Sequence, residues 1–293
     1  MARLKIHLCN EVVRTLDFRG QCAFAHAAGY DGLEIAPFTL ADDPTRLPAA
    51  QVSELRRIAN DQGVGIAGLH WLLAAPANLS ITSEDPAIFR ATCDAGRRLI
   101  DLCAGLGGTY LVHGSPQQRQ LAPGREAQGR AQAVAYFSAM ADAAHATGVD
   151  YILEPLSRLD TTLAAGVEEA VAMVAEIGSP ALKTMVDCYA VSADGEDISA
   201  VLDKWLASGS VAHVHFNDDN KGGPGQGGID FATILRTLER HAYAGAAAVE
   251  PFVYLPDGPS CAARAIGFLR GLEQCRNAGE SLSEPLRSER PSA

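Results

Sequence analysis

The segment HVHFNDDN, residues 213–220, alternates polar side chains that could bind a metal ion with apolar ones. In an extended strand, side chains on alternate residues point to the same face. His213, His215 and Asn217 would therefore share one face, with apolar residues on the other. Imidazole nitrogens and carboxylate oxygens are both ligands for divalent cations. The segment is either a polar surface turn or the end of a strand that holds a metal ion.

Ionisable or imidazole side chains also lie late in other short apolar segments. They are Glu34, His70, His113, Glu154, Asp187 and Glu250. Burying such groups without partners costs several kcal/mol each, so a shared partner is expected. Three carboxylates with one imidazole suit Mn²⁺, Mg²⁺ or Co²⁺ better than Zn²⁺, which prefers thiolates. The alternative is that these side chains form salt bridges in the interior of the fold or lie at exposed loop ends.

The elements that must position these residues are eight short apolar segments separated by stretches of helical periodicity. The expected strands cover residues 4–9, 32–37, 65–71, 109–115, 150–156, 182–188, 211–218 and 246–252. Strands that alternate with helices predict a parallel sheet with right-handed crossovers. Eight such units predict an α/β fold, a (β/α)8 TIM barrel, in which the carboxyl ends of the strands build the active site.

A doubly wound sheet is the structural alternative, but no GxGxxG motif follows the first expected strand. We expect residues 1–277 to form a single barrel domain. Residues 278–293 are polar and rich in Pro and Ser, and we expect them to form a loose C-terminal tail.

The overall composition excludes several classes of partner. A net charge of −11 disfavours a nucleic-acid backbone or an anionic membrane. No stretch approaches the roughly 18 apolar residues of a spanning helix, and the N-terminus lacks the apolar segment of a secretory signal. Seven cysteines without a CxxC pair are typical of reduced, packed thiols in a cytoplasmic protein.

Four motifs resemble those of the xylose isomerase-like TIM barrel superfamily, and within it the sugar phosphate isomerase/epimerase group that includes the ketose 3-epimerases. The motifs are LEPLSRLDT (153–161), MVDCY (185–189), VHFND (214–218) and VEPF (249–252). The resemblance covers the second to eighth expected strands, which is most of the chain.

The resemblance implies a specific metal site. Glu154 and Glu250 would be the two catalytic glutamates that also bind the metal. Asp187 would be a third ligand, and the position of VHFND makes His215 the fourth ligand rather than His213. The implied cofactor is one divalent cation, Mn²⁺ first, with Mg²⁺ or Co²⁺ as alternatives.

The resemblance also implies contacts to the substrate. Asp160 would contact a substrate hydroxyl, and Lys221 stands where the 3-epimerases carry a substrate-binding Arg. His70 and His113 are similar in position to histidines that bind extra metal ions in the related AP endonuclease fold; here we expect them to contact substrate, as we do Glu34. Family members commonly carry a His where this chain has Ala190.

The expected function is a metal-dependent isomerase or epimerase of carbohydrate metabolism, which acts on a ketose or keto-sugar through an enediolate. The two glutamates would serve as acid and base. The alternatives are a lyase or dehydratase of a keto-sugar or inosose-type substrate, an AP endonuclease, and a non-catalytic sugar-binding protein. The expected partner is a small-molecule sugar, and we also expect a homo-oligomer, either a dimer or a tetramer.

Overall fold

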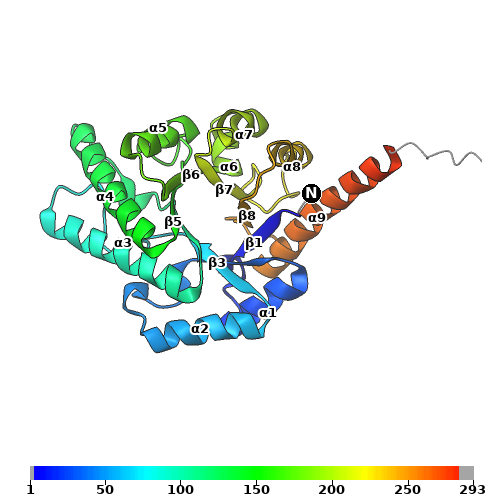
Figure 1. The fold of residues 1–293 in the computed structure, drawn as a ribbon, viewed down its shortest axis with the longest axis horizontal. Helices are drawn as coiled ribbons and strands as arrows, with labels where there is room; N and C mark the ends of the chain where they lie inside the picture. The colour runs from blue at the N-terminus through cyan, green and yellow to red at the C-terminus, as the bar shows by residue number, and fades with distance from the viewer. Residues whose placement is uncertain (1–2, 284–293) are drawn as a thin grey trace, which may run out of the picture.

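Eight parallel strands form a closed barrel in the computed structural model, which describes residues 3–283 (Figure 1). Each strand pairs with the next one along the chain, and the last pairs with the first. The strands are β1 (Lys5–Cys9), β2 (Gly32–Ile35), β3 (Gly65–Leu69), β4 (Tyr110–His113), β5 (Asp150–Leu153), β6 (Leu182–Asp187), β7 (Val211–Phe216) and β8 (Ala246–Val249). Each of the eight predicted segments contains one strand, so the predicted (β/α)8 barrel is confirmed.

Helices connect the strands and surround the barrel (Figure 1). They are α1 (Phe18–Ala28), α2 (Ala49–Asp61), α3 (Pro86–Leu106), α4 (Glu126–Thr147), α5 (Val167–Ile177), α6 (Cys188–Ala193), α7 (Ile198–Leu206), α8 (Phe231–Arg240) and α9 (Gly258–Ser283). Helix α9 enters the segment expected to be a loose tail, and residues 284–293 lie outside the described residues. Within residues 3–283, no helix combines the length and the apolar character needed to cross a membrane.

Local sequence explains where these helices begin and end. The side chain of Asp85 accepts a hydrogen bond from the backbone N–H of Ala87 at 2.7 Å and so satisfies a free donor in the first turn of α3. Asp17, Asp197 and Asp230 do the same for α1, α7 and α8. Helix α3 stops at Gly107, whose φ of 89° lies in the left-handed region that glycine adopts at low cost.

The interior of the barrel is lined by a small group of side chains that is separate from the main core. This group comprises Tyr110, Val112, Ile152 and Met185, with Ala67 and Ala212 beside them. These residues come from strands β3 to β7, which are not all neighbours, so their side chains must meet inside the barrel. Because side chains alternate along a strand, Leu111 and His113 of β4 point outward, toward the helices. The larger apolar core fills the layer between strands and helices.

Candidate metal centre and active site

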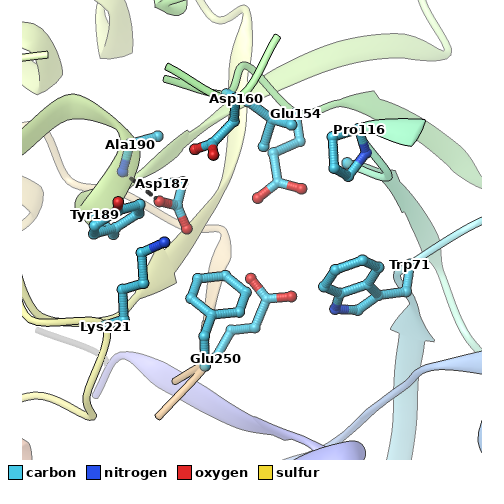
Figure 2. A pocket seen from close by; sticks show the side chains of 12 residues that line it. Trp71, Pro116, Glu154, Asp160, Asp187, Tyr189, Ala190, Lys221 and Glu250 are labelled. Carbon is cyan, nitrogen blue, oxygen red and sulfur yellow. Dashed lines mark hydrogen bonds between the residues drawn. The ribbon is translucent and has the colours of Figure 1, made fainter. Parts of the chain in front are cut away.

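The four residues predicted as metal ligands come together at the carboxyl ends of β5 to β8. Asp187 is the last residue of β6 and His215 lies near the end of β7, while Glu154 and Glu250 directly follow β5 and β8. Figure 2 shows the three carboxylates pointing toward the same space. All four side chains are buried, and one potential ligand atom from each lies within 4.8 Å of the others.

The Nδ1 atom of His215 lies at the centre of this group. It is 2.8 Å from Oε2 of Glu250, 3.1 Å from Oε1 of Glu154 and 4.0 Å from Oδ2 of Asp187. Burial and the neighbouring charges of Glu154 and Glu250 raise the pKa of Asp187 to about 7. Carboxylates at such distances repel one another unless a positive charge lies between them. Three carboxylate oxygens with one imidazole nitrogen therefore fit a hard divalent cation.

Asn217 fixes the orientation of Asp187. Its amide nitrogen donates to Oδ2 of Asp187 at 2.7 Å, and its amide oxygen accepts from the backbone N–H of Tyr189 at 2.7 Å. The other oxygen of Asp187 accepts from the backbone N–H of Ala190 at 2.7 Å. The sequence pattern predicts that Asn217 shares a strand face with His215, but it does not indicate a function for Asn217. The structure shows that it holds a potential ligand in place.

Glu34 lies below the four residues and does not line the pocket. Its Oε1 accepts from Nε2 of His215 at 2.9 Å, and its Oε2 accepts from the hydroxyl of Tyr110 at 2.6 Å. His213, one layer deeper than His215, places its Nε2 3.0 Å from the same Oε2. Although burial opposes ionisation, His213 and His215 hold the pKa of Glu34 well below its usual value. An ionised carboxylate can only accept, so Nε2 of His215 donates to Glu34, and Nδ1 is the nitrogen that a cation would bind. Although burial opposes this, the charges of Glu250, Glu34 and Glu154 hold the pKa of His215 well above its usual value, so a cation would displace a proton from Nδ1.

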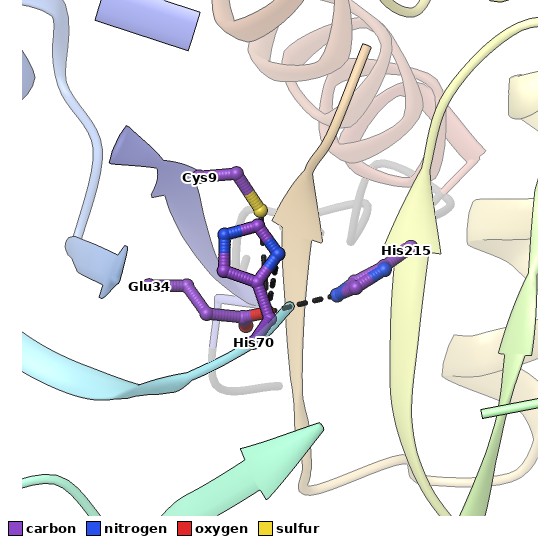
Figure 3. Close-up of side chains that lie close together, drawn as sticks. All are labelled: Cys9, Glu34, His70 and His215. Carbon is purple, nitrogen blue, oxygen red and sulfur yellow. Dashed lines mark hydrogen bonds and ion pairs between the residues drawn. The ribbon is translucent and has the colours of Figure 1, made fainter. Parts of the chain in front are cut away.

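His70 lies behind Glu250 rather than in the pocket. Its Nδ1 is 3.0 Å from Oε1 of Glu250, and its Nε2 is 2.9 Å from Oε2 of Glu11. Although burial lowers the pKa of His70, the charges of Glu11 and Glu250 raise it to about 10. Figure 3 shows the His70 ring beside Glu34 and His215, with Cys9 close by.

His113 points away from the site. Its ring packs against Tyr136 and Phe137 of α4, and its Nδ1 lies 2.8 Å from the hydroxyl of Tyr151. Burial lowers the pKa of His113 to about 3, so the ring is neutral at physiological pH. Glu34, His70 and His113 were expected to contact substrate, but the structure buries all three outside the pocket lining.

The pocket above the carboxylates has a volume of about 250 Å³. It is lined by Trp71, Gly114, Pro116, Glu154, Leu156, Asp160, Asp187, Tyr189, Ala190, Lys221, Glu250 and Phe252. The carboxylates form its floor, and aromatic and aliphatic side chains form much of its wall (Figure 2). Drug-sized ligands occupy pockets of roughly 300–1,000 Å³, so this one suits a smaller molecule. Sequence reasoning missed Trp71, Pro116, Leu156, Tyr189 and Phe252, although each lies in a segment that follows a strand.

Asp160 and Lys221 line the pocket, as their predicted substrate role requires. The Nζ atom of Lys221 lies 4.8 Å from the centre of the Tyr189 ring. The backbone carbonyl of Lys221 accepts from the N–H groups of Phe252 and Val253, at 2.8 and 2.9 Å. These two bonds fix the loop, and Lys221 keeps a φ of 64° there. The side chain of Lys221 extends along the side of the pocket (Figure 2).

Gly114 and Arg119 shape the backbone around Glu154. The fully buried guanidinium of Arg119 donates to the backbone carbonyls of Glu154 and Gly114, both at 2.8 Å. A Cβ atom at Gly114 would lie 1.6 Å from Oε2 of Glu154. Only glycine therefore lets the carboxylate take this position.

Comparisons with known proteins agree with this architecture. The family model described as xylose isomerase-like TIM barrel matches residues 22–272. A ketose 3-epimerase of Arthrobacter globiformis is 30% identical over 212 residues, which cover 68% of this chain and 71% of that protein. An L-ribulose 3-epimerase of Methylomonas sp. (strain DH-1) is 28% identical over 236 residues, covering 80% and 78%.

Solved structures show the same fold. A D-allulose 3-epimerase from Methylomonas sp. superposes with a TM-score of 0.76 at 24% identity, covering 93% of this chain and 99% of that one. A 3-keto-D-glucoside 4-epimerase from E. coli gives a TM-score of 0.79 at 17% identity, covering 92% and 100%. With the barrel, the motifs and the relatives in agreement, this chain belongs to the xylose isomerase-like TIM barrel family and is an enzyme of the isomerase type.

Proposed function

We propose that the protein is a divalent-metal-dependent epimerase that inverts a carbon atom next to the carbonyl of a ketose. The observation that carries this proposal is the placement of Glu154 and Glu250. Both line the pocket, both lie beside Nδ1 of His215, and they come from β5 and β8. The relatives named as ketose and L-ribulose 3-epimerases support a ketose as the substrate.

Glu154, Asp187, His215 and Glu250 would hold one divalent cation, for which Mn²⁺ is our first choice and Mg²⁺ or Co²⁺ the alternatives. The bound cation would act as a Lewis acid, which makes the carbon next to a carbonyl easier to deprotonate. Asp187 would act only as a ligand, because Asn217 and the backbone N–H of Ala190 already occupy its two oxygens.

Epimerisation needs one acid–base group on each face of the reacting carbon. One glutamate would take the proton from that carbon, leaving an enediolate, and the other would return a proton from the opposite side. Glu154 and Glu250 would meet this requirement, and their arrival in the pocket from two different strands, β5 and β8, supports that assignment. In the reverse reaction the two groups exchange roles.

The pocket wall would orient the sugar. Lys221 and Asp160 line the pocket and would hydrogen-bond to substrate hydroxyl groups. Trp71 and Phe252 offer apolar surface on which the C–H faces of a sugar can rest. The buried floor and the small volume favour a free monosaccharide or a molecule of similar size.

The experiment that tests this proposal is turnover of a panel of ketoses in D₂O with added Mn²⁺. The expected product has the same connectivity as its substrate and carries one solvent deuterium at the inverted carbon. Glu154→Gln and Glu250→Gln should each lower the rate by several orders of magnitude, since each removes a base and weakens a ligand. A product that has lost water or another group would show that the enzyme is a lyase instead. Isomerisation without deuterium incorporation would contradict a mechanism in which the glutamates transfer protons that exchange with the solvent.

A further inference from the structure

Hydrogen bonds connect three buried side chains in a row, from the first turn after β1 to the pocket floor. Glu11 lies in the short 3-10 helix Asn10–Val13, and its Oε2 is 2.9 Å from Nε2 of His70. On the other side of the ring, Nδ1 of His70 is 3.0 Å from Oε1 of Glu250. Glu11 is 6% exposed, His70 1% and Glu250 3%, so water does not compete with these hydrogen bonds.

The two hydrogen bonds fix the orientation of the His70 ring. Its Nε2 faces an oxygen of Glu11 and its Nδ1 faces an oxygen of Glu250. A buried polar group without a partner is costly, and Glu11 supplies that partner on the side of the ring remote from Glu250. Glu11 thereby keeps the ring in the position in which it binds Glu250.

The carboxylates of the two pocket glutamates differ in the number of side chains that hydrogen-bond to them. Oε1 of Glu250 is occupied by His70, and its Oε2 is the atom that lies 2.8 Å from Nδ1 of His215. For Glu154, His215 is the only side chain within hydrogen-bond distance of the carboxylate in the part of the chain that the structure describes. The Oε2 atom of Glu154 instead lies against the backbone of Gly114.

We propose that Glu11 and His70 are a positioning pair that holds the Glu250 carboxylate with Oε2 toward the pocket, so that Glu250 is the fixed acid–base group and Glu154 the adjustable one. This inference rests on the proposed acid–base roles of the two glutamates. Glu11 and His70 do not line the pocket and act through Glu250.

A second metal ion is the competing explanation for these residues. Cys9, Glu11, His70 and Glu250 each offer a potential ligand atom, and these atoms lie within 4.8 Å of one another. At hydrogen-bond distance each nitrogen of His70 faces one carboxylate oxygen, which one N–H group satisfies, whereas Nδ1 of His215 faces two, from Glu154 and Glu250. Hydrogen bonds to Glu11 and Glu250 therefore account for the position of His70 without a metal ion.

The kinetic test compares Glu11→Ala with Glu11→Gln. Glu11→Ala removes the acceptor for His70, and kcat should fall by about 10- to 100-fold, as for outer partners of other metal-site residues. KM should change little when it is measured at a saturating concentration of Mn²⁺, at which one Mn²⁺ per chain should still bind. Glu11→Gln keeps an amide oxygen that can accept from Nε2, and should recover part of kcat. Glu273→Gln is the matched control, because Glu273 is a buried glutamate of α9 paired with Arg270. It should keep the wild-type kcat.

A purely structural role for Glu11 would lower the melting temperature of both Glu11 variants while kcat stays at the wild-type value, and that result would overturn the proposal. If Glu11→Ala does not fold, the isosteric Glu11→Gln decides the kinetic question. A kcat indistinguishable from wild type in Glu11→Gln would then overturn the proposal too.

Crystal structures of the wild type and a Glu11 variant, both soaked with Mn²⁺, provide a readout that needs no turnover. The wild type should keep the bond from Nδ1 of His70 to Glu250, and the variant should show the Glu250 carboxylate rotated or in more than one orientation. A second metal ion bound to Glu11 and His70 would overturn the proposed positioning role of these residues. An unchanged orientation of Glu250 in the variant would do the same. This result stands even if no ketose is epimerised, so it separates failure of this inference from failure of the proposed function.

Discussion

Nε2 of His215 donates to Oε1 of Glu34 at 2.9 Å, which leaves Nδ1 as the ring nitrogen that faces the carboxylates of the site. Glu34→Gln keeps the shape of this contact but removes its charge. A Gln amide can also present its N–H group to the ring, which would favour the wrong tautomer. We expect the affinity for Mn²⁺ to fall by about 10- to 100-fold, as judged by titration with Mn²⁺ monitored by EPR. Equal affinity in wild type and variant would show that Glu34 does not set the tautomer.

The metal site should require His215 itself. His215→Ala removes the only nitrogen of the predicted ligand set, and we expect the purified variant to contain much less than one divalent ion per chain. His213→Ala, one layer deeper, should retain most of the metal. Elemental analysis of both variants measures this directly. Unchanged metal content in His215→Ala would refute the assigned ligand set.

Metal binding should weaken as the pH falls below about 7. Burial and the charges of Glu154 and Glu250 raise the pKa of Asp187 to about 7 in the metal-free site. Below this pH a proton competes with the cation for Asp187, whereas above it the carboxylate is already ionised. The dissociation constant for Mn²⁺ should therefore rise by about tenfold or more between pH 7 and pH 6, since the raised pKa of His215 means that a proton also competes with the cation for its Nδ1. Titrations at several pH values would show whether the dependence has this sign.

Lys221→Ala should weaken substrate binding without affecting the metal. Loss of a hydrogen bond from a charged donor costs about 1.5–3 kcal/mol, which corresponds to a rise in KM of roughly 10- to 100-fold. Ala should tolerate the left-handed backbone at this position no worse than Lys does, since both carry a Cβ. Steady-state kinetics with a metal analysis of the same sample would test both halves of the prediction. Loss of the metal would place Lys221 in a different role.

Gly114→Ala should displace Glu154 while the barrel stays folded. The new Cβ would lie 1.6 Å from Oε2 of Glu154, which is the end of a side chain and can move aside. We expect at least a tenfold loss of kcat with little change in the melting temperature. Gly65→Ala is the control, because a Cβ there meets nothing within 4 Å. Full activity in Gly114→Ala would mean that the observed position of Glu154 is not needed for catalysis.

His113 should make the fold sensitive to acid. Its pKa is about 3 in the folded protein because of burial, and about 6.5 in an unfolded chain. Between these values the unfolded state binds more protons, so this contribution to stability is complete above about pH 6.5 and is lost as the pH falls toward 3. The slope is at most about 1.4 kcal/mol per pH unit. Unfolding of His113→Gln should depend less steeply on pH from 7 to 4; parallel curves for the two proteins would contradict this assignment.

The approximate residue ranges of the strands and the end of the barrel that holds the candidate site could be predicted from the sequence, but the direction of each side chain could not. Both faces of a parallel strand are buried in a barrel, so the apolar pattern does not tell which alternate residues face inward. In β4, Tyr110 faces the interior, and His113 therefore points toward α4. Glu34 does face inward, but it lies at the depth of His213 and below the pocket. The register between β2 and β3 shifts between Leu33 and Glu34, and no sequence pattern indicated that shift.

His70 illustrates a second limit. Its partner Glu11 lies in a short 3-10 helix after β1, 59 positions away in the chain. No local periodicity connects the two residues, because their contact depends on the pairing of β1 with β2 and of β2 with β3. The four proposed ligands were easier to find because each lies within one residue of the carboxyl end of its own strand.

The floor and the wall of the pocket belong to different parts of the chain, and this separation bears on how the enzyme could be diversified. The floor is formed by residues at strand ends, which the closed barrel holds in place. Trp71, Leu156, Ala190 and Phe252 of the wall come from four separate segments that follow different strands. A mutant library restricted to these four positions would vary the shape offered to a sugar and leave the carboxylates, His215 and their supporting hydrogen bonds untouched. New substrate preferences could then be selected one segment at a time, each step starting from an enzyme whose chemical groups are intact.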